Sequence, residues 1–144
     1  MNTFFAPHGE FKINISNNIL IARLAGSWNQ ECAESFSQAF KTHAESLKHE
    51  KWGHLVFLDD WELSVPEILP IVTDLVSFCI ENGLEKSAQV YSESMIKKFF
   101  VDQMATEKHG NFERQIFSHQ DKAIEWLNSY GFTITEGFVA DDLV

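Results

Sequence analysis

Residues 54–67 read HLVFLDDWELSVPE and decide the fold of this 144-residue chain. Residues 55–58 are apolar without alternation, which predicts a strand that is buried on both faces of a sheet. Acidic residues follow at once, and Ser64 then opens a helical pattern. In parallel α/β sheets, functional residues gather where such a strand meets the next helix. We therefore expect the strand at the centre of the sheet and the site at residues 59–62.

The length and charge of the chain favour one acidic globular domain. A chain of 144 residues can bury a core without disulfides or a metal. Its 21 acidic and 11 basic residues give a formal net charge of −10, which repels nucleic-acid phosphates and anionic membranes. The longest apolar region, residues 68–80, contains Pro70 and Asp74 and is too short to cross a bilayer. We expect neither nucleic-acid binding nor membrane insertion.

The cysteines and the first residues favour a reducing cytoplasm. Cys32 and Cys79 lie far apart in predicted helices and match neither a CxxC motif nor a disulfide scaffold. We interpret them as core thiols, because a nucleophilic cysteine needs an activating base and an electropositive, accessible setting. Residues 1–8 lack the basic and apolar regions of a secretory signal.

Hydrophobic periodicity predicts five strands and four helices in the order β-β-α-β-α-β-α-β-α. The strands are expected at residues 11–16, 19–25, 55–58, 87–91 and 112–118. The helices are expected to open at Ser27, open at Ser64, carry Met95 to Met104, and open at Ser118. Asn17-Asn18 can form a tight turn, so the first two strands should be an antiparallel hairpin. Helical crossovers favour parallel strands after it, which predicts an α/β fold with a mixed sheet.

The predicted domain spans residues 1–132, and residues 133–144 form a short tail. The charges in residues 112–118 favour a strand at the edge of the sheet. Asn82-Gly83 favours the end of the second helix. The tail interleaves apolar and acidic residues, and it could dock on its own domain or on a neighbouring molecule.

Three segments carry a family resemblance. They are Ile21-Ala22-Arg23-Leu24-Ala25-Gly26-Ser27-Trp28, then Leu58-Asp59-Asp60, and Ile116-Phe117-Ser118 leading into Ala123-Ile124-Glu125-Trp126-Leu127. With the element order, they resemble the SpoIIAA-like branch of the STAS superfamily, the anti-sigma-factor-antagonist fold that overlaps in classification with SEC14-type lipid-binding domains. The likeness covers residues 11–132. It implies a bacterial protein-binding domain of STAS-like fold.

The resemblance breaks at the regulatory position of the family. Bacterial antagonists of the regulatory type carry a phosphorylated serine or threonine directly after an aspartate. Asp59 matches that aspartate, but Asp60 and Trp61 follow it here. A single carboxylate supplies less charge and fewer acceptors than a phosphate. We therefore expect no phosphoswitch, and we interpret Ser64 as a helix cap.

The acidic loop is the favoured partner-binding surface, formed by Asp59, Asp60, Trp61 and Glu62. Its carboxylates could also act in acid-base chemistry or bind Mg or Ca. The plainer interpretation is that acids near a helix N-terminus complement the helix dipole and stay solvated. Trp61 is either an exposed anchor for a partner or a cover for the sheet edge. The six histidines are dispersed without HExxH spacing, so we expect no metal site.

An apolar ligand pocket is the alternative site, formed by Met95, Phe99, Phe100 and Met104 on the third helix. The same spacing is typical of ordinary core packing between a helix and a sheet. No GxGxxG or P-loop motif is present, so no nucleotide cofactor is expected. The sequence favours a non-enzymatic domain that binds an unknown protein. The alternative is binding or sensing of a small apolar or lipid-like molecule, as the SEC14 likeness implies, and a homodimer is left open.

Overall fold

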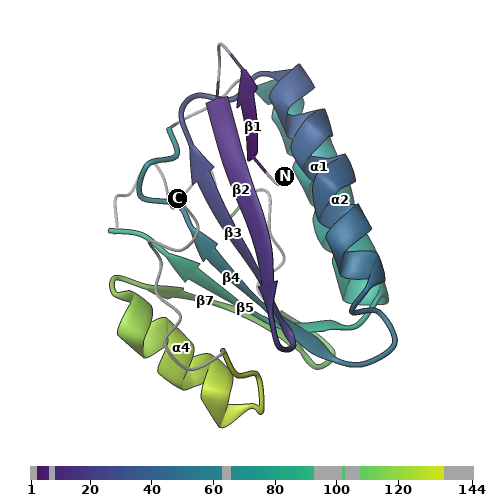
Figure 1. The fold of residues 1–144 in the computed structure, drawn as a ribbon, viewed down its shortest axis with the longest axis vertical. Helices are drawn as coiled ribbons and strands as arrows, with labels where there is room; N and C mark the ends of the chain where they lie inside the picture. Colours follow the sequence, from purple (N-terminus) through teal and green to yellow (C-terminus); the bar gives the residue numbers. More distant parts are fainter. Residues whose placement is uncertain (1–2, 7–8, 63–65, 93–101, 103–107, 135–144) are drawn as a thin grey trace.

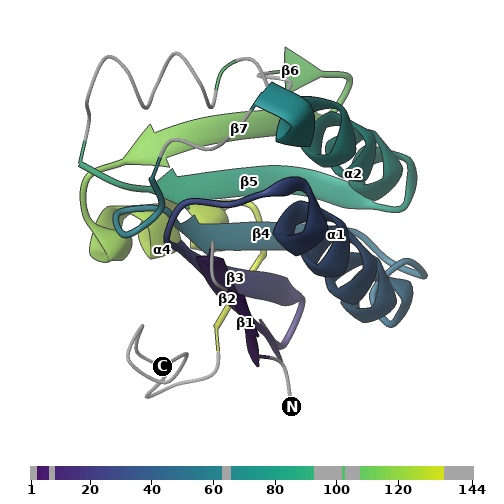
Figure 2. The same cartoon turned by 90° about the horizontal axis from the view of Figure 1, so that it is seen from above.

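A computed structural model describes residues 3–6, 9–62, 66–92, 102 and 108–134. Two helices, α1 and α2, lie side by side on one face of a twisted sheet, and α4 covers the other face (Figures 1 and 2). The elements are β1 (Thr3–Ala6), β2 (Gly9–Ser16), β3 (Ile19–Ala25), α1 (Gln30–Glu45), β4 (Trp52–Phe57), the 3-10 turn η1 (Pro66–Ile68), α2 (Leu69–Glu81), β5 (Leu84–Val90), β6 (Lys108–His109), β7 (Phe112–Phe117) and α4 (Gln120–Ser129).

The sheet is mixed, as predicted, and its described strands follow the order β1-β2-β3-β4-β5-β7-β6. Strands β1, β2 and β3 are antiparallel neighbours, while β3, β4, β5 and β7 run parallel. Two short strands were not predicted. Strand β1 precedes the hairpin, and β6 pairs with β7 through only Lys108 and His109. Such short segments carry too few residues for a periodic signal. The expectation that residues 112–118 form the sheet edge is wrong at Phe112 and Glu113, which pair with β6, whereas no described strand pairs with the outer side of residues 114–117.

The predicted central strand is confirmed, since β4 lies between β3 and β5 with both faces covered. Leu55 and Phe57 join the core under α4. Trp52 and Val56 join the larger core under α1 and α2. A strand with apolar side chains on both faces fits only between two helical layers, which is why its sequence shows no alternation.

The hairpin turn also anchors the end of the domain. Asn17 has a φ of 51° in the turn between β2 and β3. The side chain of Asn18 donates from Nδ2 to the Gly131 carbonyl at 3.1 Å and accepts at Oδ1 from the Thr133 backbone amide at 3.1 Å. Ile134 packs against the core under α4. Thr133 and Ile134 therefore contact the domain, although the predicted boundary lies at residue 132.

Two helices begin later than predicted. The cap of α1 is Asn29, whose Oδ1 accepts from the Cys32 amide at 2.9 Å, instead of Ser27. Between them, Trp28 is buried with its Nε1 donating to the Ala25 carbonyl at 3.0 Å, so the helix starts only after this side chain has been placed. The cap of α4 is His119 instead of Ser118.

The second helix begins differently from its sequence pattern. The turn η1 leads into α2, whose N-cap Ile68 makes no side-chain capping bond. The predicted cap Ser64 lies outside the described residues, so its role stays a prediction. The predicted third helix, with Met95, Phe99, Phe100 and Met104, lies outside them as well, apart from Asp102, which is helical.

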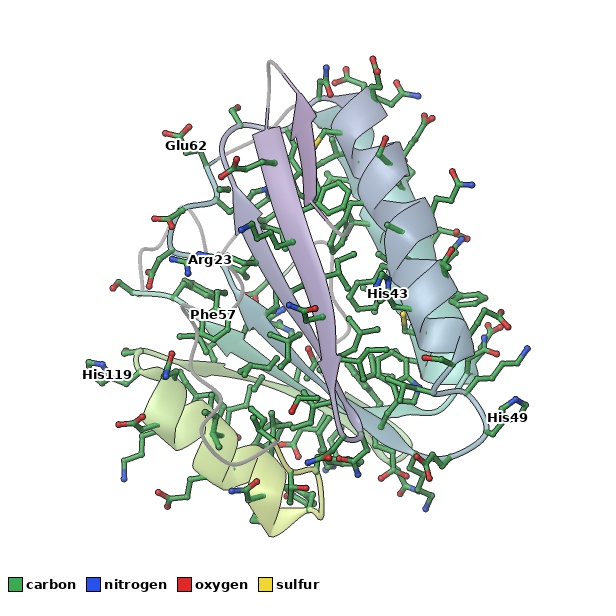
Figure 3. The ribbon with its side chains drawn as sticks, viewed as in Figure 1. Arg23, His43, His49, Phe57, Glu62 and His119 are labelled. Carbon is green, nitrogen blue, oxygen red and sulfur yellow. The ribbon has the colours of Figure 1, made fainter. Side chains whose placement is uncertain are left out.

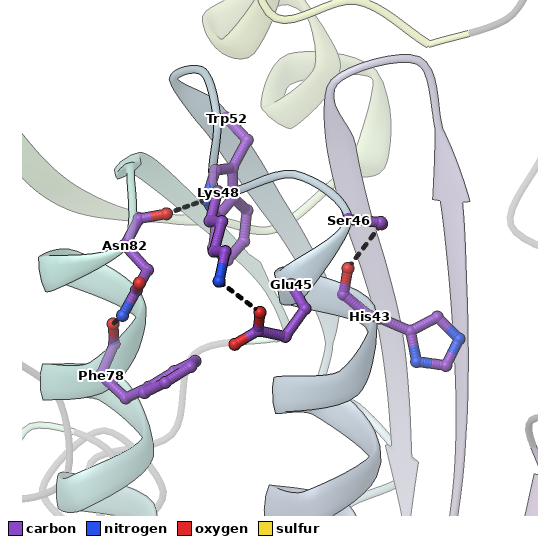
Figure 4. Close-up of polar contacts among 7 residues, drawn as sticks. All are labelled: His43, Glu45, Ser46, Lys48, Trp52, Phe78 and Asn82. Carbon is purple, nitrogen blue, oxygen red and sulfur yellow. Dashed lines mark hydrogen bonds and ion pairs between the residues drawn. The ribbon is translucent and has the colours of Figure 1, made fainter.

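The C-terminal end of α2 is tied to the start of β4 (Figure 4). Asn82 donates from its side-chain Nδ2 to the Phe78 carbonyl at 2.7 Å, and Trp52 Nε1 donates to the Asn82 backbone carbonyl at 2.8 Å. Gly83 follows with a φ of +102°, a conformation that favours glycine. The predicted end of this helix at Asn82-Gly83 is therefore confirmed.

Both cysteines are buried free thiols, as predicted. Burial raises the pKa of Cys32 to about 11 and that of Cys79 to about 12. Neither thiol is a ready nucleophile, since the thiolate is the reactive form. None of the helices in the described part of the chain has the length and apolar character needed to cross a membrane.

Candidate functional site

Two roles were left open for Trp61 of the acidic loop, an exposed anchor for a partner and a cover for the sheet edge, and its burial excludes the exposed anchor. Its side chain is 3% exposed and packs edge-on against Trp28, with ring centroids 5.8 Å apart. Both rings belong to the core under α1 and α2. A bulky aromatic side chain at the end of a central strand gains more by covering the core than by facing water.

The remaining acidic side chains of the loop face solvent on a fixed backbone. The Gly26 amide donates to the Asp60 carbonyl at 2.9 Å, and the Glu62 amide donates to the Gly26 carbonyl at 3.1 Å. Asp60 forms an ion pair with Arg23 at 3.2 Å. Asp59 accepts from the Ser92 amide at 2.7 Å, while the exposed Glu62 points away from the protein body (Figure 3).

The described residues offer no metal centre. They contain no group of three or more His, Cys, Asp or Glu side chains that could hold an ion. His49 and His119 project from opposite sides of the molecule, and His43 lies on α1 (Figure 3). Among the described residues, no further ligating group therefore supports a metal site or acid-base chemistry at the acidic loop.

A cavity of about 90 Å³ lies between the helical layer and the sheet. Its walls are apolar. They include Phe36 and Phe40 of α1, Val72, Leu75, Val76 and Cys79 of α2, and Leu24, Trp28, Val56, Leu58, Trp61, Leu84 and Phe112. Trp61, which was predicted as part of the partner-binding surface, therefore lines this cavity.

The floor of the cavity is polar. His54 of β4, Ser87 of β5 and Arg114 of β7 are paired in one row across the sheet, so their side chains share the face under α1 and α2. Gln89, two residues along β5, joins them. Ser87, Gln89 and Arg114 are all buried, which is uncommon for side chains of these types.

These polar groups are only partly satisfied by one another. His54 Nδ1 lies 3.2 Å from Ser87 Oγ. Arg114 donates from Nη1 to Gln89 Oε1 at 3.0 Å and from Nη2 to Asp102 Oδ1 at 2.7 Å. His54 Nε2 and Arg114 Nε are buried without a hydrogen-bond partner among the described residues. Buried polar atoms without a partner are rare and call for an explanation such as a bound molecule.

The setting keeps His54 neutral. Burial lowers the pKa of the imidazole to about 3, because the charged ring would lose its hydration. Part of the ring surface remains accessible, but Nε2 itself is buried. At neutral pH the ring carries one N–H, and either nitrogen can hold it.

The sequence contains a weak indication of this polar floor, but none of its residues was among the predicted site residues. Ser87 and Gln89 place polar side chains at alternate positions of a strand between two parallel neighbours, where apolar residues are the rule. His54 and Arg114 are isolated in the sequence, and only the sheet register brings them into one row. The alternative pocket residues Met95, Phe99, Phe100 and Met104 are outside the described part of the chain.

Solved structures identify the fold. No family model and no curated protein matches the chain. An uncharacterised protein of the DUF3478 family from Shewanella loihica PV-4, with a SpoIIAA-like fold, superimposes with a TM-score of 0.64 at 12% identity, covering 86% of this chain and 98% of that one. The protein TM1081 superimposes with a TM-score of 0.57 at 15% identity, covering 87% and 94%. At such identities the likeness extends to the fold alone.

Proposed function

We propose that this chain, a domain of SpoIIAA-like fold, is a non-enzymatic binding domain that holds a small apolar molecule in the cavity between α1, α2 and the sheet. The proposal is carried by one observation: a cavity of about 90 Å³ walled by apolar side chains from both helices and from the sheet. Sites for small molecules are concave, mostly apolar and equipped with few polar groups. The sequence also pointed to an apolar ligand as the alternative function, but it assigned that ligand to Met95, Phe99, Phe100 and Met104. The present proposal keeps the apolar ligand and assigns it to the residues that line the cavity.

The absence of an enzymatic role is part of the same proposal. The two cysteine thiols have raised pKa values, and His54 has a lowered one. A neutral imidazole could still act as a base, but its described neighbours Ser87 and Phe40 do not form an activated nucleophile with an orienting third group. We therefore expect binding without turnover.

Xenon tests this proposal, because it enters apolar cavities without requiring hydrogen bonds. Amide NMR spectra of the whole protein under xenon pressure should show shifts confined to residues that line the cavity. Val76→Phe should remove these shifts by filling the space, while Ser77→Phe, on the exposed side of α2, should leave them intact. If the spectra of the parent protein did not change under xenon, the proposal would be contradicted.

Protein binding through the acidic loop is a second candidate. It is supported by the exposed carboxylates of Asp59, Asp60 and Glu62 on a backbone fixed to Gly26. An acidic loop on a fixed backbone suits a partner with a basic surface. Charge complementarity between the two would contribute more to the specificity of binding than to its affinity. Trp61 is excluded from this surface by its burial. Partner capture should fall in Asp60→Ala with Glu62→Ala and persist in the control Asp121→Ala, which changes an exposed acid on α4.

A further inference from the structure

Helix α4 covers only part of its side of the sheet. It packs on β4, β5 and β7, while β3 and β2 continue the sheet beyond β4. Two rows of the strand register cross this continuation, Asn14–Ile21–Leu55 and Lys12–Arg23–Phe57. Rows two residues apart share one side of a sheet, and Leu55 and Phe57 belong to the core under α4. Lys12, Asn14, Ile21 and Arg23 therefore form a surface beside α4, the β2–β3 face.

The cover of the β2–β3 face changes along its length. Ile21 is completely buried. The side chain of Arg23, on the α4 side of the strands (Figure 3), is 30% exposed, and Lys12 is half-buried. A hollow of about 170 Å³ opens there, lined by Glu10, Phe11, Lys12, Arg23, Ala25 and Asp60. The face is therefore covered near Ile21 and accessible around Lys12 and Arg23.

The charges around this hollow leave one cation unbalanced. Arg23 pairs with Asp60 at 3.2 Å. Among the ion pairs of the described residues, none involves Lys12, although the exposed Glu10 lies on the same strand. A carboxylate brought to Lys12 would gain a modest attraction, because both groups would stay close to water.

The described chain ends at the entrance to this face. Asn17 Nδ2 donates to the Thr133 carbonyl at 3.3 Å, and Asn18 Oδ1 accepts from the Thr133 amide. These bonds hold Thr133 at the turn that begins β3. Ile134 then packs on the core under α4. The chain therefore passes from the turn onto the sheet, beside the covered end of the β2–β3 face.

The residues that follow are long enough to reach the accessible end. Arg23 lies four residues along β3 from Ile19, next to the turn, a distance of about 13 Å in a strand. Seven residues separate Ile134 from Asp141, and an extended chain of that length spans up to about 23 Å. Phe138 and Val139 lie between them in the sequence, and Asp142 adds a second carboxylate.

We propose that residues 135–144 dock on the β2–β3 face of the same molecule. Phe138 and Val139 extend the apolar core beyond Ile134, and the acidic pair Asp141-Asp142 brings a carboxylate to Lys12. The apolar side chains supply most of the binding free energy, since an exposed ion pair contributes little. This docking is separate from the proposed ligand cavity, which lies on the other side of the sheet.

A spin label at residue 140 of the full chain tests the location. Ala140→Cys adds an accessible thiol, whereas Cys32 and Cys79 are buried. In amide NMR spectra the label should broaden the signals of Lys12 and Arg23. Replacing both Phe138 and Val139 with serine should lower the docking equilibrium constant about tenfold or more, because two apolar side chains lose their burial. The broadening at Lys12 should then fall, while that near the anchored Thr133 persists.

Charge reversal tests the contact with Lys12. Lys12→Glu should lower the docking equilibrium constant about threefold, the effect of one exposed ion pair. Asp141→Lys combined with Asp142→Lys should do the same, and the combination with Lys12→Glu should restore docking. The control Lys122→Glu makes the same charge change at an exposed position of α4 and should leave docking unchanged.

A mixed sample distinguishes docking within one molecule from docking between two. Spin-labelled protein without ¹⁵N is mixed with ¹⁵N protein without the label, and the signals of Lys12 and Arg23 should stay sharp. Broadening in this mixture would overturn docking on the same molecule. Equal broadening at Lys12 in the parent and in the double serine variant would overturn docking itself. Unaltered docking in Lys12→Glu would overturn the role of Lys12. Thermal melts identify any variant that fails to fold, in which case the broadening pattern of the labelled parent decides.

Discussion

Trp61 lies edge-on against Trp28, with ring centroids 5.8 Å apart and both side chains almost fully buried. The contact joins the end of β4 to the segment that leads into α1, and the Gly26 and Trp61 backbones form an isolated parallel bridge beside it. The acidic loop is therefore part of the scaffold on its inner side and a charged surface on its outer side. Its tryptophan is one of the side chains that line the cavity between the helices and the sheet.

The burial of Trp61 gives the first prediction. Trp61→Ala should lower the free energy of unfolding by ~3–5 kcal/mol, because it removes a buried aromatic ring and leaves a larger void. Urea denaturation measures the change. The neighbouring control Glu62→Ala, at an exposed position, should change stability by less than about 0.5 kcal/mol. If the Trp61 variant were as stable as the parent protein, the conclusion that this side chain is buried would be contradicted.

The cap of α1 gives the second prediction. Asn29→Ala should lower stability by ~1 kcal/mol, because the Cys32 amide loses its acceptor. Asn29→Asp keeps an oxygen at the same place and should retain most of the stability. Chemical denaturation of both variants tests the assignment. A full loss in the aspartate variant would show that the side chain acts through something other than capping.

Protonation of His54 gives the third prediction. The folded pKa of about 3 lies below the unfolded value of about 6.5. The unfolded state therefore binds one more proton between these values, so stability is complete above pH 6.5 and falls as the pH drops toward 3. The slope from this group approaches about 1.4 kcal/mol per pH unit.

The pH dependence has a matched control. His54→Leu should flatten the stability profile between pH 4 and 6.5, whereas His49→Gln, at an exposed position of the loop after α1, should leave it unchanged. Denaturation midpoints measured across this range give both profiles. An unaltered slope in His54→Leu would show that the acid sensitivity comes from other groups.

The two thiols give the fourth prediction. Cys32 and Cys79 should resist iodoacetamide at pH 8 in the native protein, because their raised pKa values leave little thiolate. Both should react rapidly in denaturant. Mass spectrometry counts the modified sites, and rapid native labelling of Cys79 would indicate that the wall of α2 opens to solvent.

Sequence reasoning predicted the strands whose pattern extends over several residues. The uninterrupted apolar run in β4 and the Asn17-Asn18 turn each have a local physical cause, so they are readable without the fold. Whether a tryptophan faces the core or the solvent is not decided by its neighbours in the sequence. Trp61 is flanked by acids in the sequence, and only the packing of Trp28 and α1 decides that it faces inward.

The cavity was beyond sequence reasoning for the same physical reason. His54, Ser87 and Arg114 come from three strands, and the hydrogen-bond register of the sheet alone aligns them. The space above them depends on how far α2 stands from the sheet, which no side-chain pattern records. The alternative pocket was assigned to the aromatic-rich residues 95–104 because periodicity indicates apolar faces but not the voids between them.

A crystal structure under xenon pressure tests the central claim most directly. The account predicts xenon density between α1, α2 and the sheet, in contact with Phe40, Leu75 and Val76 and above His54. A cavity closed by these side chains, with no xenon bound there at a pressure that fills comparable apolar cavities, would contradict it.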